Sequence, residues 1–134
     1  MGLMLTRISD LTDSQRDEVR RMVKDQADFR IRDWENPDSP QSVYAVDERL
    51  TFIGMCSWSG ETFCAQPYLW LHPDHRKKGL GTKMADAFAA TMKGTGVTGL
   101  ARIHIVATED ESGAANVLAA KLRAHFPRRS DGSK

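Results

Sequence analysis

The sequence contains little cysteine and no surplus of charge of either sign. Two of its 134 residues are cysteines, Cys56 and Cys64, and they do not form a Cys-x-x-Cys pair. Such isolated cysteines favour free thiols over a metal site or a disulfide framework, so we expect a reducing compartment, the cytoplasm. Nineteen Lys and Arg residues against eighteen Asp and Glu residues give a net charge of +1. We therefore expect neither nucleic acid nor an anionic membrane as a partner.

Long apolar runs are also missing. No stretch is long enough to span a bilayer, and the apolar run within residues 1–7 is too short for a signal peptide. The composition is otherwise that of a globular protein, with 40% hydrophobic and 28% charged residues. Because a chain of this length suits one domain, we predict a single domain over residues 1–126, followed by a basic, polar tail over residues 127–134.

The spacing of apolar residues predicts alternating strands and helices. A capping box at Thr12 and Gln15 begins a helix that we expect to extend to Phe29, followed by a loop over residues 33–41. Three antiparallel strands and then a strand–helix–strand crossover imply an α/β (α+β) fold, with a mixed, mostly antiparallel sheet flanked by helices. The predicted strands are 3–8, 42–46, 50–58, 62–71 and 101–107. A second helix is predicted from Thr82 and is closed by Gly94 and Gly96, and a last helix is predicted within residues 111–126.

The segment 69–82, which joins a strand to a helix, is the most informative part of the sequence. Glycines at positions 79 and 81 leave the backbone open where the first turn of the helix has unpaired N–H groups. Basic residues stand close by, at positions 76, 77, 78 and 83. Two glycines can simply form a tight turn, but open amides beside cations suit a diphosphate. A dinucleotide-binding fingerprint would need a third glycine where the chain has Met84, and the Walker pattern is not satisfied either.

Residues Arg76 to Gly81 match the pattern (Q/R)-x-x-G-x-(G/A), and the sequence therefore resembles the GNAT superfamily of N-acetyltransferases. The resemblance covers the order of elements from residue 3 to about 126, and its specific part is 69–82. It implies that acetyl-coenzyme A is the cosubstrate, with backbone amides of the loop on the pyrophosphate and the preceding strand on the pantetheine arm. It also implies that the strands 62–71 and 101–107 separate to admit the cofactor. The residues assigned to coenzyme A in this way are Leu69, Leu71, Arg76, Lys77, Lys78, Gly79, Leu80, Gly81, Thr82 and Asn116.

Two residues of the last predicted helix each allow a functional and a purely structural interpretation. Asn116 is equally typical of a first helical turn. Many GNAT enzymes have a tyrosine further along the last helix that protonates the departing thiolate, whereas the matching residue here is Arg123 and no tyrosine follows Tyr68. Arginine keeps its proton at neutral pH, so Arg123 could stabilise a thiolate electrostatically, or it could be a solvated helix residue.

Direct transfer needs a base that removes a proton from the acceptor amine. We select Glu109 and Asp110, which end a predicted strand beside the expected thioester and could act through water. Three alternatives are Glu61, His72 and His104. We interpret His72, which precedes a proline, as structural, and His104 as a half-buried strand residue.

The resemblance implies an acetyl-CoA-dependent N-acetyltransferase that works by direct attack of an amine on the thioester. The acceptor is not identified, although the loop around residues 30–35 is expected to shape its pocket and an amine of a peptide or protein is favoured. The alternative is a GNAT-like binding or structural module that binds coenzyme A without turnover. Only eight residues follow Phe126, where the family adds two strands. We therefore expect a shortened C-terminal end, with the strand 101–107 at an exposed edge open to a second copy or a protein partner.

Overall fold

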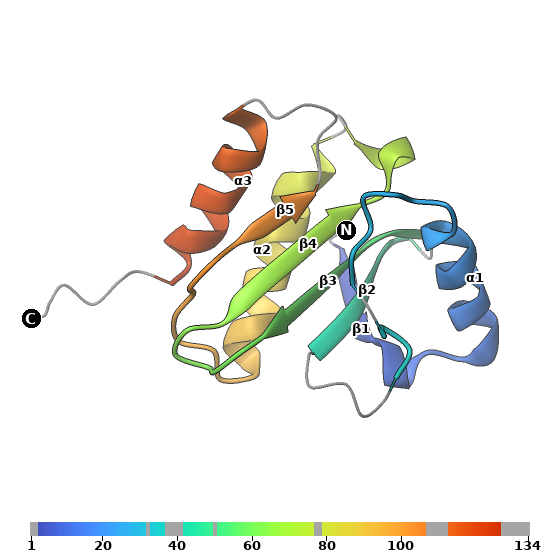
Figure 1. Cartoon of the computed structure of the whole chain (residues 1–134), viewed down its shortest axis with the longest axis horizontal. Coiled ribbons are helices and arrows are strands. Elements are labelled where there is room, and N and C mark those ends of the chain that lie inside the picture. The colour runs from blue at the N-terminus through green and yellow to red at the C-terminus, as the bar shows by residue number, and fades with distance from the viewer. Residues whose placement is uncertain are drawn as a thin grey trace, which may run out of the picture.

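The computed structural model describes residues 3–31, 33–36, 42–49, 51–76, 79–106 and 113–126, and Figure 1 shows how they are arranged. No helix among these residues is both long and apolar enough to cross a bilayer. In chain order the elements are β1 (Met4–Arg7), a 3-10 turn (Ile8–Asp10), α1 (Asp13–Val23), β2 (Ser42–Glu48), β3 (Thr51–Ser59), β4 (Gln66–Leu71), a second 3-10 turn (Pro73–His75), α2 (Leu80–Gly94), β5 (His104–Val106) and α3 (Gly113–Ala124).

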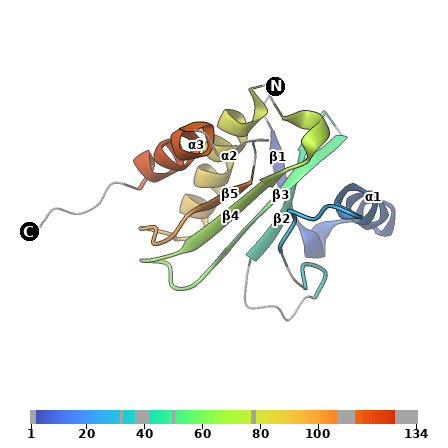
Figure 2. The same cartoon turned by 45° about the horizontal axis from the view of Figure 1, so that its top comes forward.

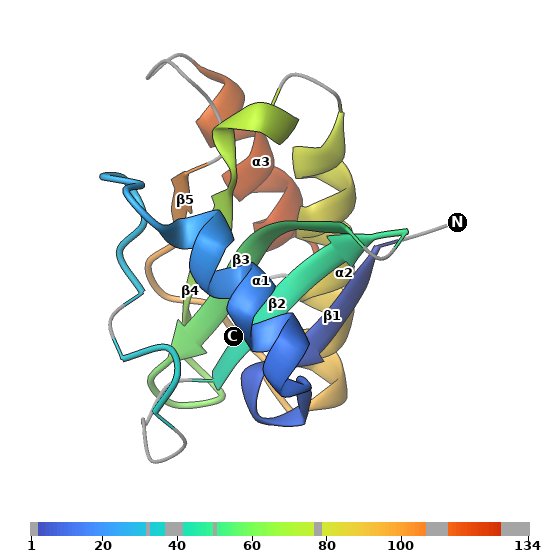
Figure 3. The same ribbon diagram turned by 90° about the vertical axis from the view of Figure 1, so that its right-hand side faces the viewer.

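The described strands form one sheet in the order β1-β2-β3-β4-β5. Neighbouring strands from β1 to β4 are antiparallel, whereas β5 is parallel to β4 because α2 carries the chain back along the sheet. α1 lies on one face of the sheet and α2 and α3 lie on the other (Figure 2, Figure 3). This arrangement confirms the predicted mixed, mostly antiparallel sheet flanked by helices.

A hydrophobic core fills the space on each side of the sheet. On the side of α2 and α3, the helix residues Met84, Phe88 and Met92 are fully buried, as their four-residue spacing predicts. On the side of α1, Val19 packs with Met55 of β3. Successive side chains of a strand point to opposite faces, so each central strand supplies alternate residues to the two cores.

The first helix is shorter than predicted. The capping box at Thr12 is present, but the helix ends at Val23, and Asp25 adopts a left-handed backbone with φ of 62°. That conformation is incompatible with a continued right-handed helix, and aspartate tolerates it better than most residues. Phe29 therefore lies outside α1. Its ring packs edge-on against Trp70, with ring centroids 5.0 Å apart, so it still contributes to the core that α1 covers.

Two element boundaries differ from the prediction for local reasons. The strand predicted at 62–71 begins at Gln66, because residues 61–64 form a turn in which the Cys64 amide donates to the Glu61 carbonyl over 3.0 Å. The helix predicted from Thr82 begins two residues earlier, at Leu80, because Gly79 caps it. Glycine at a helix boundary can adopt backbone angles that other residues avoid, and this fixes the start of α2.

The predicted separation of the strands 62–71 and 101–107 is not observed in the described residues. β4 and β5 remain paired through Leu69–Ile105 and Trp70–Val106, and Ile105 packs against the core that contains Leu69. The pairing is irregular further back, where its register slips by one residue between the Ala65–Leu100 bridge and the Tyr68–His104 pair. The slip delays the start of the strand predicted at 101–107 to His104, since residues 101–103 fall within it. Residue 107 lies outside the described residues.

Candidate functional site

The glycine loop ends in the first turn of α2. Gly79 is the N-cap of this helix and has a left-handed backbone with φ of 75°, which residues with a Cβ rarely adopt. A Cβ added to Gly79 would meet no atom within 4 Å, so the backbone borders open space here. The first N–H groups of an α-helix have no partner inside the helix, and this turn is therefore suited to bind an anionic group. Lys77 and Lys78 lie outside the described residues.

Gly81, unlike Gly79, lies in a tightly packed environment. A Cβ on Gly81 would lie 3.0 Å from a methyl carbon of Leu118, so this glycine allows α2 and α3 to pack closely. The Leu80 side chain is buried in the same core, and Thr82 is exposed on the first turn of α2. A contact of these three residues with coenzyme A through the backbone stays a prediction.

The Arg76 side chain is directed into the protein. Its Nε donates to the Leu71 carbonyl over 2.9 Å, and an NH2 group donates to Asp28 Oδ2 over 2.8 Å. The side chain is only 4% exposed. Arg76 thus ties the end of β4 to the segment that follows α1, and the role that we predicted for it in cofactor binding would have to come from its backbone.

Asp28 is the centre of a small polar network that sequence reasoning did not identify. Its carboxylate also accepts a hydrogen bond from Trp70 Nε1 over 2.8 Å, and its carbonyl accepts one from the Tyr68 hydroxyl over 2.9 Å. Partial burial acts to raise the pKa of Asp28, but the hydrogen bonds from Trp70 and Arg76 outweigh it and the pKa is lowered. The carboxylate is therefore charged at neutral pH and holds the segment after α1 against β4.

Three polar residues form a row across the sheet on the face that carries α1. Ser57 of β3 is directly opposite Tyr68 of β4, and Tyr68 is directly opposite His104 of β5. Ser59 and Gln66 are opposite each other two residues further along β3 and β4. The Tyr68 and His104 rings are stacked, with centroids 5.1 Å apart and an interplanar angle of 19°. The core under α1 includes residues of β2 and β3, and exposure along the row rises from the buried Ser57 to the exposed His104.

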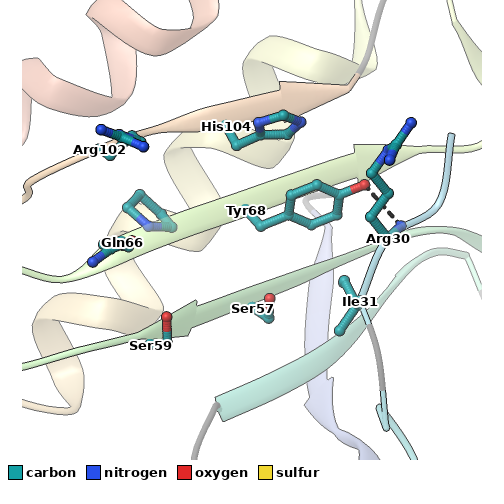
Figure 4. Close-up of a pocket in the computed structure, with 9 residues that line it drawn as sticks. Arg30, Ile31, Ser57, Ser59, Gln66, Tyr68, Arg102 and His104 are labelled. Atoms are coloured by element: carbon teal, nitrogen blue, oxygen red, sulfur yellow. Dashed lines mark hydrogen bonds between the residues drawn. The ribbon is translucent and has the colours of Figure 1, made fainter.

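A cavity of about 270 Å³ lies over this row, and we call it the strand-face pocket. Figure 4 shows Arg102 and Gln66 toward one end and Arg30 toward the other, beyond the Tyr68 hydroxyl. The Arg30 amide donates to that hydroxyl over 3.1 Å. The lining residues are Arg30, Ile31, Ser57, Ser59, Gln66, Pro67, Tyr68, Arg102 and His104.

Residues of the loop after α1 line two separate hollows. Arg30 lines the strand-face pocket, while residues 33–36 are the described lining of another hollow of about 500 Å³. A role of this loop in an acceptor pocket stays a prediction. Glu35 is turned toward α1, where its carboxylate forms an ion pair with Arg20 at 2.6 Å. Arg32 lies outside the described residues.

Comparison with known proteins identifies the family of this fold. The model of the acetyltransferase (GNAT) family matches residues 8–122, which run from the first 3-10 turn into α3. The chain belongs to the GNAT acetyltransferase family. No curated protein sequence matches it. Acetyl transfer is the general activity of the family, and its members use acetyl-CoA.

Solved structures of other GNAT proteins share the fold at low sequence identity. A ribosomal-protein-alanine N-acetyltransferase from Brucella melitensis biovar Abortus 2308 is 16% identical, with a TM-score of 0.56 over 100% of this chain and 96% of that one. An aminoglycoside acetyltransferase from an uncultured soil metagenomic sample is 15% identical, with a TM-score of 0.50 over 96% of this chain and 90% of that one. At such identities the likeness establishes the fold of this GNAT domain and not its acceptor.

The remaining predicted residues of the GNAT site lie at different places in the fold. The Leu69 and Leu71 side chains are buried, so only their backbone could contact a cofactor. Asn116 is exposed on α3, near its start, and Glu109 and Asp110 lie outside the described residues. Arg123 donates from an NH2 group to the Ala101 carbonyl over 3.0 Å, which anchors the segment before β5 to α3.

The three alternative bases also differ in position. His72 accepts a hydrogen bond at Nδ1 from the Asp74 amide over 3.0 Å and so caps the 3-10 turn, which agrees with a structural role. Glu61 is exposed in the turn before β4. His104 is exposed rather than half-buried, since β5 is at the edge of the described sheet, and it faces the strand-face pocket. The register of the strands, and not the local sequence, gives it this position.

Proposed function

We propose that this GNAT domain transfers the acetyl group of acetyl-coenzyme A to an amine by direct attack on the thioester. The observation that carries the proposal is the open, left-handed turn at Gly79, which begins α2 just after β4 ends. It supports a pyrophosphate cradle formed by the backbone of residues 77–82, with the main chain at Leu69 and Leu71 beside the pantetheine arm. Arg76 supports this role indirectly, because it fixes the end of β4 to the segment after α1.

In the proposed reaction the acceptor is bound in the strand-face pocket. Its amine nitrogen forms a bond to the acetyl carbon, the carbon–sulfur bond breaks, and coenzyme A leaves as a thiolate. The amine proton passes to a base, and we propose Glu109 or Asp110 acting through water. His104 is the second candidate, because histidine exchanges protons near neutral pH and this one faces the pocket.

Tyr68 does not serve as the acid or the base in this scheme. Burial raises the pKa of its phenol, and the hydroxyl already donates to the Asp28 carbonyl while accepting from the Arg30 amide. Arg123 is engaged with the Ala101 carbonyl. We therefore propose that the thiolate leaves without a dedicated protein acid and takes its proton from water.

A binding module without turnover is the second candidate function. The position of Arg123 favours it, because the residue that matches the family tyrosine contacts the backbone beside β5. Release of free thiol from acetyl-CoA, measured across a panel of amines and peptides, separates the two functions. Turnover above the rate of spontaneous hydrolysis supports the enzyme, and its absence with normal coenzyme A binding supports the module.

The cofactor site has a matched pair of test variants in the same helix. Gly79 and Gly96 stand at opposite ends of α2, both have a left-handed backbone, and a Cβ on either would meet nothing within 4 Å. Gly79→Ala and Gly96→Ala should each cost about 1–2 kcal/mol of stability through backbone strain. Calorimetry should show coenzyme A binding weakened about tenfold or more only in Gly79→Ala, because a lost hydrogen bond to a charged group has this effect. Equal affinity of the two variants would contradict the assigned cradle.

The base can be identified by pH–rate profiles of three variants. His104→Gln, Glu109→Gln and Asp110→Asn each remove one candidate, and the true base should lower turnover by about a hundredfold or more. The same variant should lose the acidic limb of the profile, while the other two keep it. If all three retain the limb, no residue proposed here is the base.

A further inference from the structure

Among the described residues that line it, the strand-face pocket has two arginines and no acidic side chain. Arg30 and Arg102 are among its walls, and the other described lining residues carry no further guanidinium or ammonium group. Neither guanidinium forms a hydrogen bond or an ion pair with any residue in the described part of the chain. The chain as a whole has a net charge of only +1, so this concentration of cations is local. Two arginines without a carboxylate partner in one cavity suit an anionic ligand.

Both arginines are attached to backbone that the fold holds in place. The Arg30 amide donates to the Tyr68 hydroxyl, which in turn donates to the Asp28 carbonyl, so this part of the loop is fixed over β4. Arg102 follows Ala101, whose carbonyl accepts the hydrogen bond from Arg123 of α3. Anchored backbone reduces the freedom that each arginine loses on binding a ligand. The fold therefore fixes the two points of backbone from which the guanidinium groups reach the pocket.

The floor of the pocket supplies neutral hydrogen-bonding groups between the arginines. Ser57, Ser59 and Gln66 face it from β3 and β4 (Figure 4). A volume of about 270 Å³ lies just below the range of roughly 300–1,000 Å³ that accommodates drug-sized ligands. The cavity therefore fits a group as small as a single amino acid or one residue of a peptide. An amine without an anionic group would leave both guanidinium groups without a partner.

We propose that the acetyl acceptor of this domain is a small amine that carries a carboxylate, bound by Arg30 and Arg102. This inference rests on the proposed function for the transfer step, but the binding of the carboxylate does not depend on turnover. The chemistry can come from a free amino acid or from an acidic residue at the N-terminus of a peptide. In either case the carboxylate is bound by a guanidinium group, and the amine is left toward His104 and the proposed thioester.

Equilibrium binding tests the proposal on the full chain in the presence of coenzyme A. The amino-acid probes are L-glutamate and L-glutaminamide, in which both carboxylates are replaced by amides. The peptide probes are Glu-Ala-Ala-amide and Gln-Ala-Ala-amide, which differ only in the side-chain carboxylate. We expect each carboxylate probe to bind about tenfold to a hundredfold more tightly than its amide partner, as for hydrogen bonds to charged groups. A stronger preference in the amino-acid arm identifies a free amino acid as the source, and a stronger preference in the peptide arm identifies a peptide N-terminus.

Variants show whether the pocket is responsible. Arg30→Gln and Arg102→Gln should each remove most of the preference for the carboxylate, whereas Arg21→Gln removes the same charge from the exposed surface of α1 and should leave it unchanged. Equal affinity for the carboxylate and amide probes, no binding of any probe, or a preference that survives both pocket variants would overturn the proposal. Carboxylate probes that bind through the two arginines but release no thiol from acetyl-CoA would contradict the proposed function and would leave the strand-face pocket as a carboxylate-binding site.

Discussion

Two rows of side chains cross the same three strands one residue apart, and their surroundings are opposite. The row Cys56–Leu69–Ile105 faces α2 and α3, where Cys56 and Leu69 are fully buried. The neighbouring row Ser57–Tyr68–His104 faces the side of α1, where exposure rises from 3% at Ser57 to an exposed ring at His104. Identical backbone geometry therefore supports a dry core on one face and a polar pocket on the other, according to which helices cover it.

The two faces of the sheet also differ in how far helices cover them. α2 and α3 cover the whole width of β3, β4 and β5 on their side, and burial there raises the pKa of the Cys56 thiol well above its usual value. Cys56 is consequently a packing residue and not a nucleophile. On the other face the core under α1 includes Val43 and Ala45 of β2 and Met55 of β3. Tyr68 of β4 and His104 of β5 line the strand-face pocket beside it. The first face is therefore a packed core, and the second carries the proposed acceptor pocket.

Truncation within the buried row is expected to have the largest effect. Leu69→Ala should lower the free energy of unfolding by about 2–5 kcal/mol, because it removes apolar contacts and leaves a cavity under α2. His104→Ala, one residue away in register on the adjacent strand, should change it by less than about 0.5 kcal/mol, because the ring is exposed. Urea denaturation measures both. Similar losses in the two variants would show that the faces do not differ in the way described.

Loss of the Arg76 side chain should have an intermediate effect on stability. Arg76→Ala removes the hydrogen bonds to Leu71 and Asp28 and should cost about 1–3 kcal/mol of stability. Because Arg76 joins the end of β4 to the segment beside the pocket, affinities for coenzyme A and for the acceptor should fall together. Arg21→Gln is the control for loss of charge. A variant with normal affinity for both ligands would show that Arg76 has only a structural role.

Tyr68→Phe is a smaller change confined to the polar row. It keeps the ring over His104 but removes the hydroxyl that bridges Asp28 and Arg30, so a cost of about 0.5–1.5 kcal/mol is expected. The acceptor KM should rise because Arg30 loses its anchor, while the affinity for coenzyme A stays the same. An unchanged acceptor KM would mean that the hydroxyl does not position the loop.

The smallest effect should appear in the dependence of stability on pH. The folded state lowers the pKa of Asp28, so the charged carboxylate contributes stability above its unfolded pKa of about 3.9 and loses it as the pH falls through the folded value. Asp28→Asn should therefore be less stable than the unmodified chain at pH 7, and the difference should shrink below about pH 4. Its side chain is 41% exposed, which limits the size of the effect. A difference that is constant from pH 7 to pH 3 would contradict this role.

Features that depend on neighbouring residues were predictable from the sequence. The capping box at Thr12 involves residues three positions apart, and it correctly marked the start of α1. The four-residue spacing of Met84, Phe88 and Met92 correctly identified the buried face of α2. These signals are local, because each expresses a preference of one turn or one helix.

Features that depend on distant parts of the chain were not predictable. Asp28 and Arg76 are 48 residues apart, and nothing in either local sequence indicates that they form a pair. The strand-face pocket was missed for the same reason. Ser57, Tyr68 and His104 are each ordinary strand residues, and only the registers of two separate strand pairs bring them into one row. The position of Gly81 against Leu118 likewise depends on how two helices pack.

The register slip between β4 and β5 determines how the length of this region can vary. Between the Ala65–Leu100 bridge and the Tyr68–His104 pair, three steps along the β4 side match four steps along the β5 side, so one residue within 101–103 is extra to the ladder. Deleting one residue there would make the pairing continuous and would leave His104 opposite Tyr68. The residues before β5 therefore act as a buffer for length: descendants of this domain can lose one codon here and keep both faces of β5.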